Sequence, residues 1–176
     1  YLGLTQRAIR MPMTLVASSV AEVFKQRAGY YFARQGECRE FFIKTSKTLL
    51  IISVLPFLMI ITLAPALFSF LFGAEWRTAG EFTRLMGIMF FFQFTVSPVS
   101  SMFVIAEKQK YDLWIQSGLF VGTVLALSAG YYLYGSAKTA ILLFSLVYSL
   151  KYGFEFLMAY RFSKGTVITP DNFLSR

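Results

Sequence analysis

Three long segments of this sequence contain no charged residue, and they restrict the possible folds more than any other feature. They cover residues 48–74, 85–106 and 113–137 and are 27, 22 and 25 residues long. A helix needs about 20 apolar residues to cross the ~30 Å hydrocarbon core of a bilayer. Each segment is therefore long enough to form a transmembrane helix, whereas buried helices of soluble proteins rarely need so many uncharged residues in succession.

Two further segments are less uniform but are also predicted to span the membrane. Residues 139–160 are apolar apart from Lys151 and Glu155. Residues 4–24 carry polar side chains every three or four positions, which predicts one polar stripe on a helix that is either interfacial or a span with one wet face. We therefore predict an all-α, polytopic integral membrane bundle. Its five spans lie near residues 4–24, 48–72, 85–106, 113–135 and 139–160.

The basic residues indicate how these spans are oriented. With alternating crossings, eleven of the seventeen lysines and arginines fall on one side of the membrane, in residues 25–47, in the turn at 107–112 and after residue 160. The other side receives five, and Lys151 lies within a span. Because cytoplasmic loops are enriched in Lys and Arg, the richer side is predicted to be cytoplasmic. Residues 163–176 then form a cytoplasmic tail. Tyr1 is not an initiator methionine, and the polar stripe of the first helix needs a partner to face, so upstream sequence is predicted to be missing.

Composition excludes several classes of function. The chain has no histidine and a single cysteine, Cys38, which excludes a zinc site, a Ser-His triad and a disulfide framework. We expect no metal and no cofactor. The net charge of +8 would suit nucleic-acid binding, but 56% hydrophobic residues favour a membrane protein with basic loops, so no nucleic-acid partner is expected.

Proline and glycine mark special positions inside the predicted spans. Each proline is either a static kink or a hinge, because it removes one backbone hydrogen bond and clashes with the preceding turn. The prolines singled out as kink or hinge candidates, in the second and third predicted spans, are Pro56, Pro65 and Pro98. Small residues four apart favour close helix packing, and they are predicted to be structural. They are Gly118, Gly122, Ala126 and Gly130.

Polar side chains within the spans are the candidate site residues. Gln93, Ser97 and Ser101 are four apart, so they form either interhelical hydrogen bonds or one wall of a cavity. Lys151 and Glu155 are also four apart. They are either interfacial groups with a snorkelling lysine or an intramembrane charge pair that a substrate or proton can break.

The first predicted helix carries the most suggestive charges. Arg7 and Arg10 are candidates for phosphate or carboxylate binding, because guanidinium groups match those oxygens in geometry; the alternative is anchoring at the interface. Thr14 and Ser18 continue the same polar stripe.

Several short motifs resemble one family. They are Arg7-Ala8-Ile9-Arg10-Met11-Pro12, the Phe72-Gly73-x-x-Trp76-x-x-Ala79 turn, Ser97-Pro98 and Glu107-Lys108-Gln109-Lys110. Over residues 1–162, the chain resembles the O-antigen and exopolysaccharide flippases of the MATE-like superfamily. The resemblance implies the last five helices of a second six-helix lobe, with an upstream lobe missing.

The resemblance implies a transporter of the bacterial inner membrane rather than an enzyme. By alternating access, it would flip a polyprenyl-diphosphate-linked oligosaccharide during surface polysaccharide biosynthesis, for example of lipopolysaccharide O-antigen. Arg7 and Arg10 would meet the diphosphate, Gln93, Ser97 and Ser101 the sugar hydroxyls, and a glycan polymerase is a possible partner.

Three alternatives remain open from the sequence. A MATE-like, cation-coupled drug or metabolite antiporter needs an acidic residue in its cavity, for which Glu22 and Glu155 are the candidates. A membrane-embedded glycan-assembly enzyme needs large outer loops, whereas the predicted ones are short. A plain membrane anchor would not need prolines and polar stripes inside its spans.

Overall fold

Helices form because a segment in lipid has to satisfy its backbone N–H and C=O groups internally. In the computed structural model, which describes residues 2–132 and 135–165 and the backbone alone for residues 2–13, every long element is an α-helix. The described residues include no strand. The long helices are α1 (Leu2–Gln35), α2 (Arg39–Phe72), α3 (Arg77–Val96), α5 (Gln109–Tyr132) and α6 (Ala137–Ser163).

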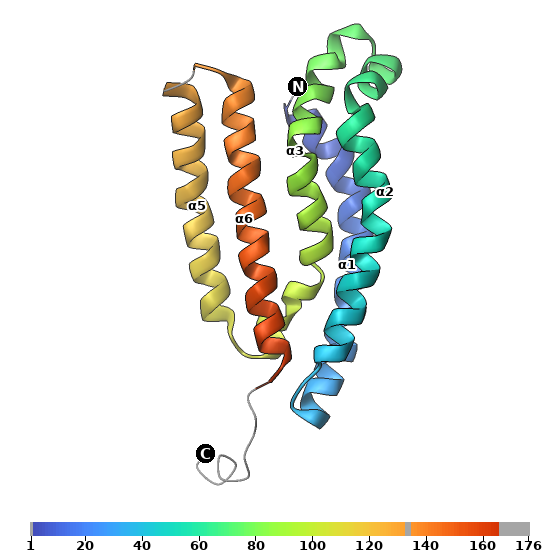
Figure 1. Cartoon of the computed structure of the whole chain (residues 1–176), viewed down its shortest axis with the longest axis vertical. Helices are drawn as coiled ribbons and strands as arrows, with labels where there is room; N and C mark the ends of the chain where they lie inside the picture. Colours follow the sequence, from blue (N-terminus) through green and yellow to red (C-terminus); the bar gives the residue numbers. More distant parts are fainter. Residues whose placement is uncertain (1, 133–134, 166–176) are drawn as a thin grey trace.

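The helices run up and down in one bundle (Figure 1). α6 lies between α5 and α3, and α2 packs along α3 on the other side. The core lies where α1, α2, α3 and the end of α6 meet, and it is rich in aromatic and methionine side chains. Its fully buried members include Phe24, Phe42, Phe90, Phe103, Met86, Met89 and Met102.

Length and composition confirm a helical membrane bundle. Three of the described helices, α2, α5 and α6, are long and apolar enough to cross a bilayer, and a fourth crossing is possible if a bent pair of segments counts as one span. Large apolar side chains on α2 and α5 face outward, as lipid contact requires: Ile51 is 71% exposed and Phe120 is 72% exposed. α1 is continuous but does not belong to this group, so a crossing by residues 4–24 stays a prediction.

The third predicted span is not one continuous helix, which corrects the expectation for residues 85–106. α3 ends at Val96, a 3₁₀ turn follows at η2 (Val99–Ser101), and α4 (Met102–Ile105) continues at an angle of 48°. Pro98 favours the break, because it cannot donate a backbone hydrogen bond and its ring clashes with the preceding turn. The last regular bond runs from the Ser97 N–H to the Gln93 carbonyl, at 2.9 Å.

The other two prolines leave their helix intact. Pro56 and Pro65 both lie inside α2, which is assigned as helical from Arg39 to Phe72. α2 ends at Gly73, whose φ of 99° is a conformation that glycine adopts readily, and the Gly73 N–H donates to the Ser69 carbonyl. Of the three prolines, therefore, only Pro98 coincides with a helix break.

The basic segments gather at one end of the bundle, as alternating crossings predict. Figure 1 places the α1–α2 connection, the α4–α5 turn and the end of α6 at the same end. The Cys38 N–H donates to the Ser163 carbonyl at 2.9 Å, which ties two of these segments together. The basic stretch at 25–47 is mostly helical rather than a loop, because only residues 36–38 separate α1 from α2. Residues 166–176 of the predicted tail lie outside the described residues.

The glycine stripe on α5 packs against α6 over part of its length. A Cβ at Gly130 would overlap the backbone of Ala140, and a Cβ at Gly122 would lie 3.0 Å from a Val147 methyl carbon. Ala126 is buried in the same interface. Gly118 has open space around it. The prediction that the four small residues serve close helix packing therefore holds for Gly122, Ala126 and Gly130 but not for Gly118.

Candidate functional site

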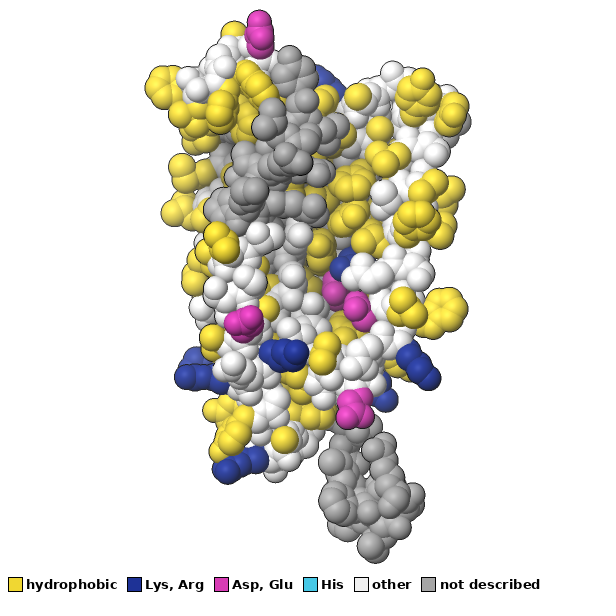
Figure 2. Space-filling view, turned by 180° about the vertical axis from the view of Figure 1, so that it is seen from behind, with side chains coloured by type: hydrophobic (Ala, Val, Ile, Leu, Met, Phe, Trp, Pro, Cys, Tyr) yellow, Lys and Arg dark blue, Asp and Glu magenta, His cyan; other side chains and the backbone are white. Residues whose placement is uncertain are grey.

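A polar cavity of about 430 Å³ lies beside the break in the third predicted span. It is bounded by the bend, by the first half of α5 and by the second half of α6. Figure 2 shows basic and acidic side chains together in a hollow at mid-height, with hydrophobic side chains beside it. Its polar and aromatic lining consists of Ser97, Ser100, Ser101, Gln109, Asp112, Gln116, Tyr148, Lys151, Tyr152 and Glu155.

The bend supplies the hydroxyl wall of this cavity. Breaking the helix after Val96 turns three serines toward α5 and α6. The Ser100 hydroxyl donates to the Ser97 carbonyl at 2.8 Å, and the Ser101 hydroxyl donates to the Pro98 carbonyl at 3.2 Å. Because a hydroxyl oxygen also accepts, these side chains can still receive hydrogen bonds from a guest molecule.

Lys151 and Glu155 form an ion pair in the wall contributed by α6. The Nζ to Oε2 distance is 2.6 Å, and the two side chains are only 9% and 5% exposed. The ammonium also lies 4.3 Å from the centre of the Tyr152 ring, a cation–π geometry. Their spacing of four residues places both on the same face of α6. The structure thus brings the two predicted residues together as a buried pair.

Asp112 on α5 adds a second carboxylate to the cavity. Gln116 lies one turn further along α5, and its amide nitrogen donates to Asp112 Oδ1 at 3.4 Å. The described lining contains one lysine, Lys151, and two acidic residues, Glu155 and Asp112, so its formal charge is −1. The cavity is therefore a better host for neutral hydroxyl-rich groups or cations than for anions.

Two tyrosine rings complete the wall of α6. Tyr148 and Tyr152 are one turn apart, with ring centroids separated by 6.4 Å. Tyr148 also packs against Phe144 at 4.6 Å, which fixes the position of its ring. Aromatic faces beside hydroxyl and amide groups offer both stacking and hydrogen bonding to a guest.

Some of the site residues predicted from the sequence line this cavity, and others lie outside it. Ser97 and Ser101 line the cavity, whereas Gln93 lies one turn before the bend and outside the lining. Gln93 Oε1 is buried and has no hydrogen-bond partner among the described residues. Thr14 and Ser18 are exposed on α1, where the Ser18 hydroxyl donates to the Leu15 carbonyl at 3.1 Å.

The predicted arginines cannot be assigned to this cavity. Arg7 and Arg10 lie in the first half of α1, and their side chains are outside the described residues. Their role in binding a diphosphate therefore stays a prediction.

Sequence reasoning missed the contribution of α5. Gln109, Asp112 and Gln116 line the cavity, and their spacing of three and four residues was a visible signal of one polar face. The signal was hidden because Gln109 and Asp112 fall in the predicted turn at residues 107–112, while Gln116 lies in the following span. α5 in fact begins at Gln109, so all three belong to one helix.

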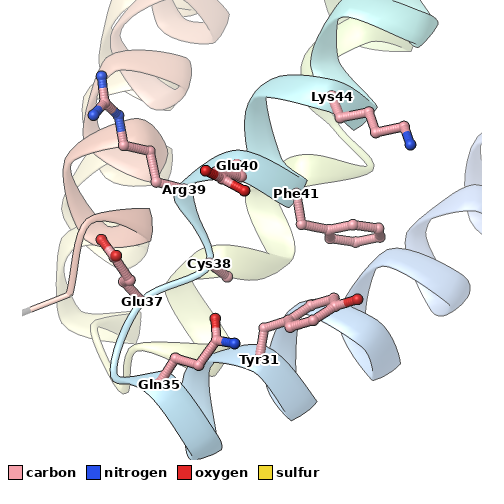
Figure 3. A pocket seen from close by; sticks show the side chains of 8 residues that line it. All are labelled: Tyr31, Gln35, Glu37, Cys38, Arg39, Glu40, Phe41 and Lys44. Atoms are coloured by element: carbon pink, nitrogen blue, oxygen red, sulfur yellow. The ribbon is translucent and has the colours of Figure 1, made fainter.

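A second cavity, of about 410 Å³, lies at the basic end, between α1 and α2 (Figure 3). Figure 3 shows Glu37, Glu40 and Arg39 around the start of α2, near Cys38. The Arg39 Nε donates to the Tyr160 hydroxyl at 3.2 Å, which holds this corner against α6. Burial, followed by the negative charge of Glu37, raises the pKa of the Cys38 thiol to about 11. These charged side chains are exposed, and the corner is best described as a structural junction.

Comparisons with known proteins add no assignment: no protein-family model, curated protein or solved structure matches this chain. Among the described residues, no group of three or more potential ligand side chains is placed to hold a metal ion.

Proposed function

We propose that this chain forms part of a bacterial inner-membrane transporter that flips a polyprenyl-diphosphate-linked oligosaccharide by alternating access. The observation that carries the proposal is the polar, tyrosine-walled cavity beside a broken helix in an otherwise lipid-facing bundle. Serine hydroxyls, glutamine amides and aromatic faces suit the hydroxyls and apolar faces of a sugar. The predicted cytoplasmic end is the one that carries the α1–α2 connection and the end of α6.

In this proposal, the glycan and its diphosphate occupy different places. The cavity between α5, α6 and the bend receives sugar residues, because its net negative charge disfavours a diphosphate. The diphosphate is assigned to Arg7 and Arg10, as the resemblance implies. No bond is made or broken in this process, so the proposal includes no enzyme activity; a glycan polymerase would be a downstream partner.

The test uses the full-length protein and measures glycan export in cells that depend on it. Gln116→Ala removes a cavity amide, and we expect export to fall about tenfold, the effect of losing ~1.4 kcal/mol of binding in the transport step. Ser117→Ala is the matched control, because Ser117 is the next residue on α5, is exposed and lies outside the cavity. Equal export by the two variants at equal protein levels would remove the cavity from the proposal.

A separate variant tests the arginines. Replacing Arg7 and Arg10 with alanine is expected to abolish export, because the diphosphate would lose its cationic partners in a low-dielectric site. Unchanged export at normal protein abundance would contradict their assigned role and leave the cavity claim standing.

A second candidate function is a cation-coupled antiporter. The specific observation in its favour is the pair of carboxylates, Asp112 and Glu155, opposed by one ammonium in the same cavity. A net negative cavity attracts a cation. Cation-driven efflux of a small molecule that disappears in Asp112→Asn, with no glycan export, would favour this function over the first.

A further inference from the structure

An apolar groove of about 630 Å³ runs along the outer face of the α5–α6 pair, next to the polar cavity. Its lining is aromatic and aliphatic, and much of it is exposed in this chain: Trp114 is 77% and Leu150 is 74% exposed. The residues in its wall include Tyr111, Trp114, Gly118, Leu150, Phe154 and Met158. Gly118 leaves a notch in the floor, because nothing lies within 4 Å of where its Cβ would be.

The length of the groove matches one leaflet of a bilayer. On α6, the groove residues run from Val147, furthest from the basic end, to Met158. Over this stretch α6 rises by about 17 Å, at 1.5 Å per residue. This is roughly half of the ~30 Å hydrocarbon core. A single lipid chain extending from the basic end of the bundle would therefore stop near Val147.

Basic side chains flank the end of the groove that lies at the membrane surface. Lys110 precedes Trp114 by four residues on α5, and Arg161 follows Met158 by three residues on α6. Both spacings put the charge on the same helical face as a groove residue. Lys110 and Arg161 are exposed, and neither forms an ion pair with another described residue.

We propose that this groove binds one acyl chain of an anionic phospholipid, whose phosphate is held by Lys110 and Arg161. The charges complement the phosphate, the groove complements the chain, and its length fits lipid from the leaflet at the basic end. Basic pockets between transmembrane helices on the cytoplasmic side are a recurrent way of binding anionic head groups. The groove shares Lys151 and Leu119 with the polar cavity, but the lipid proposal does not depend on glycan transport.

The test uses Trp114 as a probe of lipid in the groove. The chain has two tryptophans, so Trp76→Phe leaves Trp114 as the single emitter. The chain is reconstituted in phosphatidylcholine vesicles with increasing amounts of phosphatidylglycerol brominated on its acyl chains, and then with the bromine on phosphatidylcholine instead. Because bromine quenches a tryptophan that it contacts, quenching measures occupancy. We expect an apparent affinity for phosphatidylglycerol at least fivefold higher than for phosphatidylcholine.

Two variants separate charge from shape. Lys110→Gln with Arg161→Gln is expected to remove the preference, leaving both lipids within twofold of each other. The control variant, Arg77→Gln with Arg84→Gln, removes the same amount of charge from exposed residues at the opposite end of the bundle. This variant is expected to retain the preference for phosphatidylglycerol. Gly118→Leu fills the floor of the groove and should weaken quenching by both lipids while the helical circular dichroism stays unchanged.

Three results would overturn the proposal. Equal quenching by the two lipids in the parent chain would mean that bulk lipid fills the groove. Weak quenching by both would mean that something other than lipid covers it. Loss of the preference in Arg77→Gln with Arg84→Gln would mean that the total charge of the chain, rather than this site, selects the lipid.

Discussion

At the scale of single residues, the feature that most needs explanation is the buried Lys151–Glu155 pair. Removing two charges from water is expensive, and their attraction offsets that loss only while both partners are present. The pair lies in a cavity wall rather than in the packed core, next to Tyr152 and across from Asp112. The position of the ion pair therefore fits a role in the cavity better than a role in stabilising the fold.

The two charges are expected to be strongly coupled in stability. Glu155→Gln leaves the Lys151 ammonium buried without its paired carboxylate and should lower the free energy of unfolding by about 3–5 kcal/mol. Lys151→Met combined with Glu155→Met removes both charges and should recover most of that loss. Denaturant titration of the two variants and the parent in mixed micelles measures the effect. Equal destabilisation by the single and the double change would contradict a mutual dependence.

Cys38 provides a prediction about pH. Burial and the neighbouring Glu37 charge raise its thiol pKa from the usual 9.0 to about 11, so the neutral thiol is favoured in the folded chain. Since the thiolate is the reactive form, alkylation at pH 8 should be about a hundredfold slower than at an exposed thiol, and should accelerate as the pH approaches 11. The stability that the buried neutral thiol contributes is complete below pH 9 and is lost as the pH rises toward 11.

The measurement is the iodoacetamide reaction rate as a function of pH. Gln35→Cys in a Cys38→Ser background supplies the exposed reference thiol three residues away. Equal rates at pH 8 for the two thiols would show that Cys38 is neither buried nor shifted in the folded chain.

At the scale of elements, two devices shape the bundle: a break in the third predicted span and close contact between α5 and α6. The break follows from Pro98, and it converts what would be a smooth apolar helix surface into a hydroxyl-lined wall. The contact follows from Gly122, Ala126 and Gly130, which let two backbones approach. The break supplies one wall of the cavity, and the contact holds α5, which supplies a second wall, against α6.

Two glycines on α5 are expected to respond in opposite ways to substitution. Gly130→Val places side-chain atoms where the Ala140 backbone lies and should lower the free energy of unfolding by about 1–3 kcal/mol. Gly118→Ala meets open space, and should be neutral or stabilise by up to ~1 kcal/mol through helix propensity. Unfolding in mixed micelles compares the two. A similar loss for both would show that the stripe packs along its whole length.

The sequence predicts the helices well and the cavity only in part, for physical reasons. Apolar length is a local property, so residues 48–72, 113–135 and 139–160 can be recognised without knowing their neighbours. The break at Pro98 is not determined locally, because Pro56 and Pro65 occupy an unbroken helix. The polar face of α5 was missed because its residues fell on both sides of a predicted helix boundary.

At the scale of the whole molecule, charge and polarity are segregated. The connections rich in lysine and arginine lie at one end, and the segments between carry outward apolar side chains. Antiparallel neighbours place the basic connections at the same end, which is the end predicted from the sequence to be cytoplasmic. Within this frame the cavity opens in the half of α5 and α6 nearer the basic end. A substrate entering from the predicted cytoplasmic side would meet it first.

The most direct test of the central claim is translocation itself. The full-length protein is reconstituted in vesicles that contain a fluorescent polyprenyl-diphosphate-linked oligosaccharide, and the fraction of glycan accessible to an external quencher is followed over time. We predict that the inaccessible pool becomes accessible at least tenfold faster than in protein-free vesicles, and that Gln116→Ala slows this exchange whereas Ser117→Ala does not. Exchange no faster than in protein-free vesicles, with a folded and inserted protein, would contradict the account.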